Sequence, residues 1–114
     1  MSVRDILGAA SGARKKAGKP RAIAVAHGTT PFITAYPWSG SGFGTKYANP
    51  ATSPTGTGRG VAFSPDGSAI AVAHGTTPYI TAYPWSGSGF GTKYANPSTL
   101  PTGIGFGVAF NQIL

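Results

Sequence analysis

The feature that most constrains this chain is an internal repeat. Residues 22–63 match residues 69–110 at an offset of 47, and only five positions differ. The differing pairs are Phe32/Tyr79, Ala51/Ser98, Ser53/Leu100, Thr57/Ile104 and Arg59/Phe106. Such identity indicates a recent duplication or deliberate design. Because each copy must fit the same structural environment, we expect one supersecondary unit to be built twice.

Each repeat contains short apolar runs separated by turn residues, which is typical of β-strands. The 18 glycines and 10 prolines recur at fixed positions in the repeat, so they mark turns rather than low complexity. In one complete copy we expect strands at 60–63, 69–74, 79–83 and 92–95. These form a four-stranded meander of about 45 residues. The sequence therefore predicts an all-β chain.

A family resemblance lies in Val61–Ser68 and the following strand, Ala69–Ala73. The "AFSPDG" segment with this strand resembles the first two strands of WD-repeat-like β-propeller blades. The Trp-Asp signature of that family is replaced here by Tyr83-Pro84-Trp85. The chain thus resembles divergent propeller repeats of the kind found in tailed-bacteriophage virion proteins. This resemblance implies two four-stranded blades, over residues 22–68 and 69–114, without the partners of WD-repeat proteins.

The order of the expected strands has a consequence for assembly. With the strands of a blade lettered a to d from the axis outward, the chain reads bcd-abcd-a. It begins with strands at 22–27, 32–36 and 45–48, and it ends on a single inner strand at 107–110. Propellers typically have 4–8 blades, so two blades cannot close a ring.

We therefore expect the last strand of each chain to complete the first blade of the next chain. That contact is heterologous and closes by rotation into a homo-oligomer. A trimer with six blades is favoured over assemblies with four or eight. The Met1 start and the matched strand order favour this over a fragment of a longer propeller. A designed or truncated chain is a further alternative.

Residues 1–21 differ in character from the repeats. An apolar stripe with helical spacing is expected to dock on other virion proteins, and it consists of Val3, Ile6, Leu7 and Ala10. A flexible basic linker follows, with Arg14, Lys15, Lys16, Lys19 and Arg21. The segment resembles the opening of many tailed-phage virion proteins. The alternatives are a disordered tail and, less favoured, a nucleic-acid contact made by the basic residues.

The net charge of +7 belongs mainly to this segment, because six of the nine basic residues lie in the first 21 positions. The repeats are close to neutral. No apolar run approaches the ~20 residues that a membrane-spanning helix needs, so no membrane insertion is expected. A signal peptide is also missing, so secretion by the usual route is not expected. The resemblance to phage virion proteins implies synthesis in the host cytoplasm and a place in the virion.

The residue inventory argues against catalysis. The chain has two acidic residues, Asp5 and Asp66, and no cysteine, so it offers no paired carboxylates and no thiolate. His27 and His74 occupy equivalent positions without a second ligand type nearby, and a metal site is not expected. We expect each imidazole to bond to the Gly-Thr-Thr-Pro turn. The sequence predicts a protein that is not an enzyme and has no cofactor.

Aromatic residues in the glycine-rich loops are the candidates for ligand binding, and they are Trp38, Phe43, Trp85 and Phe90. An exposed tryptophan could stack on a host-surface glycan, and a ring would add avidity. The favoured alternative is that these aromatics pack between blades.

Arg59 is a second candidate; the second repeat has Phe106 at the equivalent position, just before the inner strand. In a ring, Arg59 is therefore expected near the axis in alternate blades. Such a ring of arginines could hold an anion or an axial partner. The leading hypothesis is a non-catalytic structural or attachment protein of a bacteriophage virion, in its tail or capsid decoration. A multivalent lectin-like propeller is the alternative.

Overall fold

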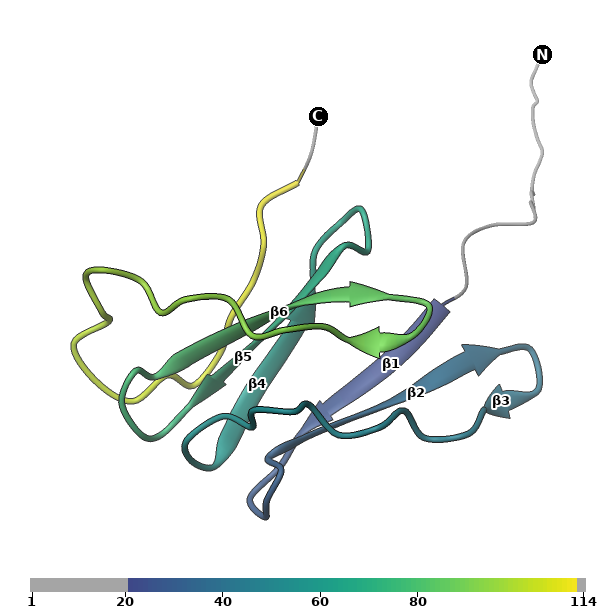
Figure 1. The fold of residues 1–114 in the computed structure, drawn as a ribbon, viewed down its shortest axis with the longest axis horizontal. Coiled ribbons are helices and arrows are strands. Elements are labelled where there is room, and N and C mark those ends of the chain that lie inside the picture. Colours follow the sequence, from purple (N-terminus) through teal and green to yellow (C-terminus); the bar gives the residue numbers. More distant parts are fainter. Residues whose placement is uncertain (1–20, 113–114) are drawn as a thin grey trace.

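The computed structural model describes residues 21–112, which form two antiparallel β-sheets and no helix (Figure 1). The first sheet has the order β1-β2-β3, with β1 at Arg21–Ala26, β2 at Ile33–Ser39 and β3 at Gly42–Phe43. The second has the order β4-β5-β6-β7, with β4 at Gly58–Phe63, β5 at Ala69–His74, β6 at Ile80–Ser86 and β7 at Gly89–Phe90. The prediction of an all-β fold is confirmed for these residues.

The two sheets repeat one backbone plan. Ala24 of β1 lies opposite Ala35 of β2, and the equivalent residues of the second copy, Ala71 and Ala82, lie opposite each other. The turns between these strands also match, since Phe32 and Tyr79 have φ values of 72° and 73°. Identical local sequence thus produces identical local geometry.

The outer strands differ from the prediction in position. We expected them at 45–48 and 92–95, but β3 and β7 start directly after a two-residue turn. Gly42 begins β3 with φ +96°, a conformation that glycine adopts without a steric penalty, so the chain reverses at once. Beyond β3 the chain keeps two backbone bonds to β2, from Gly44 N to Pro37 O at 2.8 Å and from Tyr47 N to Ala35 O at 3.0 Å.

The strand predicted at 107–110 is also absent from the described residues. The last backbone bond before it runs from Gly105 N to His74 O, at 3.1 Å. A strand needs a neighbour that takes its backbone hydrogen bonds, and residues 21–112 provide none for this segment. The segment nevertheless passes close to β4: a Cβ on Gly60 would lie 2.9 Å from Gly107 Cα.

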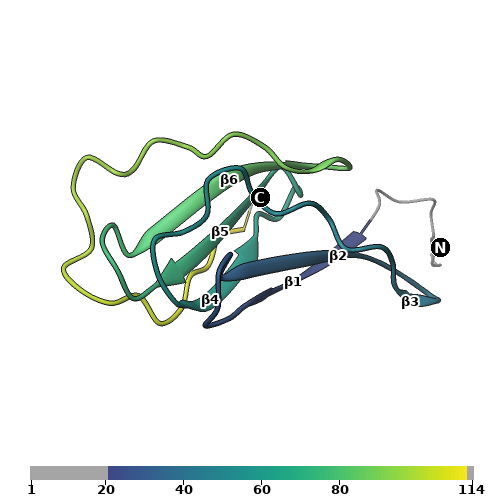
Figure 2. The same cartoon turned by 60° about the horizontal axis from the view of Figure 1, so that its bottom comes forward.

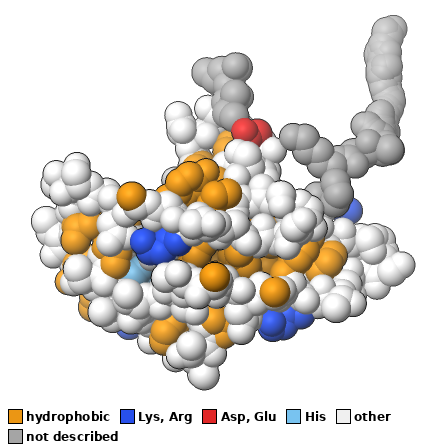
Figure 3. All heavy atoms as spheres, in the orientation of Figure 1, with side chains coloured by type: hydrophobic (Ala, Val, Ile, Leu, Met, Phe, Trp, Pro, Cys, Tyr) orange, Lys and Arg blue, Asp and Glu red, His pale blue; other side chains and the backbone are white. Residues whose placement is uncertain are grey.

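The core lies between the two sheets, which face each other in Figures 1 and 2. Its fully buried members are Ile33, Ile70, Val72 and Tyr83. Ala24 and Ala26 of the first sheet pack against them, and these small side chains let the sheets approach closely. On the face shown in Figure 3, hydrophobic side chains also reach the surface at several places among mostly uncharged atoms.

Candidate functional site

The two copies of the repeat differ sharply in burial, and this difference marks the candidate site. Ile23 and Val25 of β1 are 40% and 49% exposed. Their equivalents in β5, Ile70 and Val72, are 0% exposed. The reason is the neighbouring sheet: Ile70 and Val72 point into the core, where Ala24 and Ala26 of the first sheet pack against it, whereas residues 21–112 place no further sheet over Ile23 and Val25. An apolar face of the first sheet is therefore open to solvent, and the edge of β1 beside it has no paired strand among the described residues.

The candidate aromatic residues show the same asymmetry. Trp85 is half-buried, and its ring makes edge contacts with Tyr47 and Phe63 at centroid distances of 4.8 and 5.1 Å. It also contacts Phe90, at 5.1 Å. Tyr47 precedes the second sheet and Phe63 belongs to β4, so Trp85 packs in the space between the sheets.

Trp38 and Phe43 form the equivalent pair in the first sheet, with ring centroids 5.1 Å apart. Here the covering rings are missing from the described residues, and Phe43 is 65% exposed. The structure thus brings each predicted tryptophan–phenylalanine pair together, but packs only the second pair between sheets. The sequence analysis did not identify Tyr47 and Phe63 as partners of Trp85, because the local sequence does not indicate which aromatic rings will pack together in the fold.

The loop that connects the repeats is fixed to the second sheet by two side-chain hydrogen bonds. Thr55 Oγ1 donates to the carbonyl of Thr77 at 2.7 Å, and the Tyr83 hydroxyl donates to the carbonyl of Thr52 at 2.6 Å. Burial raises the pKa of Tyr83 to about 12, so its hydroxyl stays protonated and remains a donor. This loop joins the sheets into one unit.

The two histidines bind within their own sheets. His27 Nε2 lies 2.7 Å from Thr34 Oγ1, and His74 Nε2 lies 2.8 Å from Thr81 Oγ1. His74 is fully buried, and this burial lowers its pKa; interactions with the backbone of Thr76 and Ile80 oppose the shift. Each histidine thus bonds to a threonine side chain of the next strand, and His74 also interacts with the backbone of Thr76 in the Gly-Thr-Thr-Pro turn. Within residues 21–112 no three potential metal-ligating side chains cluster.

Arg59, the predicted axial residue, lies beside Phe106, which occupies the equivalent position in the second repeat. The Arg59 Cζ atom is 5.4 Å from the centre of the Phe106 ring, in cation–π geometry. Both side chains are exposed. The ring stacking orients the guanidinium, but whether it recurs around an axis depends on assembly.

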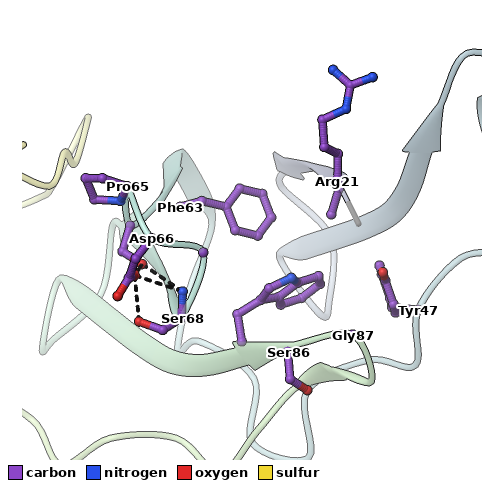
Figure 4. A pocket seen from close by; sticks show the side chains of 12 residues that line it. Arg21, Tyr47, Phe63, Pro65, Asp66, Ser68, Ser86 and Gly87 are labelled. Carbon is purple, nitrogen blue, oxygen red and sulfur yellow. Dashed lines mark hydrogen bonds between the residues drawn. The ribbon is translucent and has the colours of Figure 1, made fainter. Parts of the chain in front are cut away.

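A groove of about 780 Å³ runs between the sheets at the end marked by the β4–β5 turn. Arg21 and the turn of residues 64–68 lie on opposite sides of it, with Phe63 between them (Figure 4). Asp66 Oδ1 accepts hydrogen bonds from the Ser64 and Ser68 hydroxyls, at 2.8 and 2.7 Å, so this carboxylate organises the turn. Asp66 is a structural residue here.

The N-terminal candidates lie outside the described residues, namely Val3, Ile6, Leu7, Ala10, Arg14, Lys15, Lys16 and Lys19. Arg21 is the exception: it is exposed at the start of β1. Among the described residues, no helix is long and apolar enough to cross a membrane. Comparisons with protein-family models, curated proteins and solved structures found no match to this chain.

Proposed function

We propose that the two sheets are β-propeller blades that other copies of the chain complete, and that the assembly is a non-catalytic structural or attachment component of a bacteriophage virion. One observation carries the assembly: Val25 is half-exposed, while the equivalent residue of the second copy, Val72, is fully buried in the core between the sheets. The first sheet lacks an inner strand, and residues 107–110 are a strand sequence without a partner. The unpaired segment 107–110 of one copy could therefore supply the inner strand that the first sheet of another copy lacks.

A ring of three chains is the assembly we favour, because it has six blades and lies within the usual range for propellers. Light scattering of the full chain should then give three times the 11.5 kDa chain mass. A mass that stays at 11.5 kDa at high concentration would contradict the assembly.

The virion role is supported by the N-terminal segment and by the resemblance of the repeats to phage propeller repeats. In this proposal the apolar stripe of residues 3–10 docks on another virion protein, and the ring faces outward. Deleting residues 1–20 should leave the mass of the ring unchanged and abolish its incorporation into phage particles. Particles that still carry the truncated protein would contradict the docking role.

The groove favours a second function, a glycan-binding propeller. It combines aromatic walls from Tyr47, Phe63 and Trp85 with hydroxyl groups on its rim, which suits the apolar face and polar edge of a sugar. A glycan array would test this, with Trp85→Ala and Trp38→Ala compared, since only Trp85 lines the groove. Binding that survives Trp85→Ala would exclude the groove as the site.

A further inference from the structure

We propose that residues 96–110 form a docking arm that binds β1 and the turn of residues 28–31 in a second copy of the chain. This inference rests on the proposed self-assembly and specifies its surface. The chain itself contains the template: residues 49–63, which we call the internal arm, bind the second sheet in this way. The docking arm is the equivalent segment 47 positions later, and among the described residues there is no following sheet for it to bind.

The internal arm makes its contacts at the turn of residues 75–78. Thr55 Oγ1 lies 2.7 Å from the Thr77 carbonyl, and Gly75 N donates to Thr57 O at 3.1 Å. Gly56 is buried, and a Cβ on it would collide with the Thr76 side chain. The internal arm and the turn are thus fitted to each other at atomic contact.

In the docking arm, the equivalent residues are not covered by another part of the described chain. Thr102 and Gly103 are the equivalents of Thr55 and Gly56, and nothing lies within 4 Å of a Cβ placed on Gly103. Pro50 and Pro54 are buried in the internal arm, whereas their equivalents Pro97 and Pro101 are exposed. The exposed surface of the docking arm therefore corresponds to a surface that is buried in the internal arm.

Four of the five differences between the repeats fall on this arm, and three of them make it more apolar. Ser53, Thr57 and Arg59 of the internal arm are replaced by Leu100, Ile104 and Phe106. Ile104 and Phe106 are 48% and 70% exposed. The internal arm is held at its site by the continuous chain, which acts as a high effective concentration. A contact between separate chains lacks that advantage and needs more apolar burial.

The surface that would receive the docking arm is equally open. Tyr36, Thr29 and Thr30 are the equivalents of Tyr83, Thr76 and Thr77, to which the internal arm binds. Beside them, β1 exposes its edge. The β4–β5 ladder pairs Val61 with Val72 and Phe63 with Ile70. The same register between chains pairs Val108 with Val25 and Phe110 with Ile23.

Cysteine cross-linking tests this register directly, because the chain has no cysteine of its own. We expect Val25→Cys/Val108→Cys to form disulfide-linked oligomers under mild oxidation. Ile23→Cys/Val108→Cys, displaced by two residues on the same face, should cross-link far less. Equal or reversed yields would overturn the register.

A steric pair tests the arm itself. Gly103→Val should leave the thermal stability of the chain unchanged and weaken self-association by roughly tenfold or more, because its side chain would meet Thr29 of the second copy. Gly56→Val should instead destabilise the single chain through Thr76. Undiminished association of Gly103→Val would overturn the arm.

Different results would contradict the self-assembly and the docking arm. A chain that stays monomeric at all concentrations would contradict the proposed self-assembly. An oligomer that shows neither the Val25–Val108 cross-link nor sensitivity to Gly103→Val would leave self-assembly standing and refute the docking arm.

Discussion

The burial of Tyr83 and His74 depends on the parts of the chain that pack over them. Both are fully buried, and each uses a polar atom to bond within or across the core. Their equivalents Tyr36 and His27 have the same neighbours in sequence but are only half-buried. Local sequence places the side chain, and the adjoining element decides its environment.

Tyr83→Phe should destabilise the chain by about 1 kcal/mol, because it removes the hydrogen bond to the Thr52 carbonyl without opening a cavity. Urea unfolding at neutral pH measures the loss. Tyr36→Phe is the matched control, since among residues 21–112 its hydroxyl has no equivalent bond. An equal loss in both variants would mean that the bond to Thr52 contributes nothing specific.

The stability of the chain should fall as the pH drops below about 6.5, the ordinary histidine value. Burial lowers the pKa of His74 in the folded state, so the unfolded state binds the proton more readily. This contribution is fully present above pH 6.5 and is lost as the pH falls toward the folded-state pKa. Thermal midpoints at pH 8 and pH 5 would show it.

His74→Gln, which keeps a donor for Thr81, should flatten that pH dependence. His27→Gln should retain the slope contributed by His74. A slope that persists unchanged in His74→Gln would assign the effect to another group.

At the scale of elements, the sequence predicted the inner and middle strands well and the outer ones poorly. The runs that became β1, β2, β4, β5 and β6 were apolar and bounded by turn residues, so their ladders follow from local pattern. The outer strands depend on how tightly the chain reverses at Gly42 and Gly89, which the pattern does not specify. The segment 107–110 has strand character but pairs with no strand among residues 21–112.

Asp66→Ala should destabilise the second sheet by about 1 kcal/mol, because Asp66 Oδ1 accepts hydrogen bonds that fix the β4–β5 turn. Asp66→Asn keeps an acceptor oxygen and should retain most of the stability. Chemical denaturation of the three proteins at one pH makes the comparison. If Asn and Ala behaved alike, the acceptor would not be what matters.

At the scale of the whole molecule, substitutions at two equivalent valines, Val72 and Val25, should distinguish effects on folding from effects on assembly. Val72→Asp places a charge in the core and should destabilise the chain by about 3 kcal/mol or more. Val25→Asp alters an exposed side chain, so the fold of the single chain should change by less than about 0.5 kcal/mol while self-association is lost.

Circular dichroism and sedimentation of both variants at matched concentration would report folding and mass separately. The interpretation would be wrong if Val25→Asp were folded and still assembled like the original chain.

The sequence by itself determined the all-β class, the two copies of one unit and the positions of their central strands. These follow because strand periodicity and turn chemistry are local, and the two copies are nearly identical. Only the tertiary structure decided which copy is covered. It placed Tyr47 and Phe63 around Trp85, buried Val72 between the two sheets and left Val25 and the segment after Gly105 open. A side chain is buried where another part of the chain packs over it. Within residues 21–112, Val72 has such a neighbour in the first sheet, and Val25 has none.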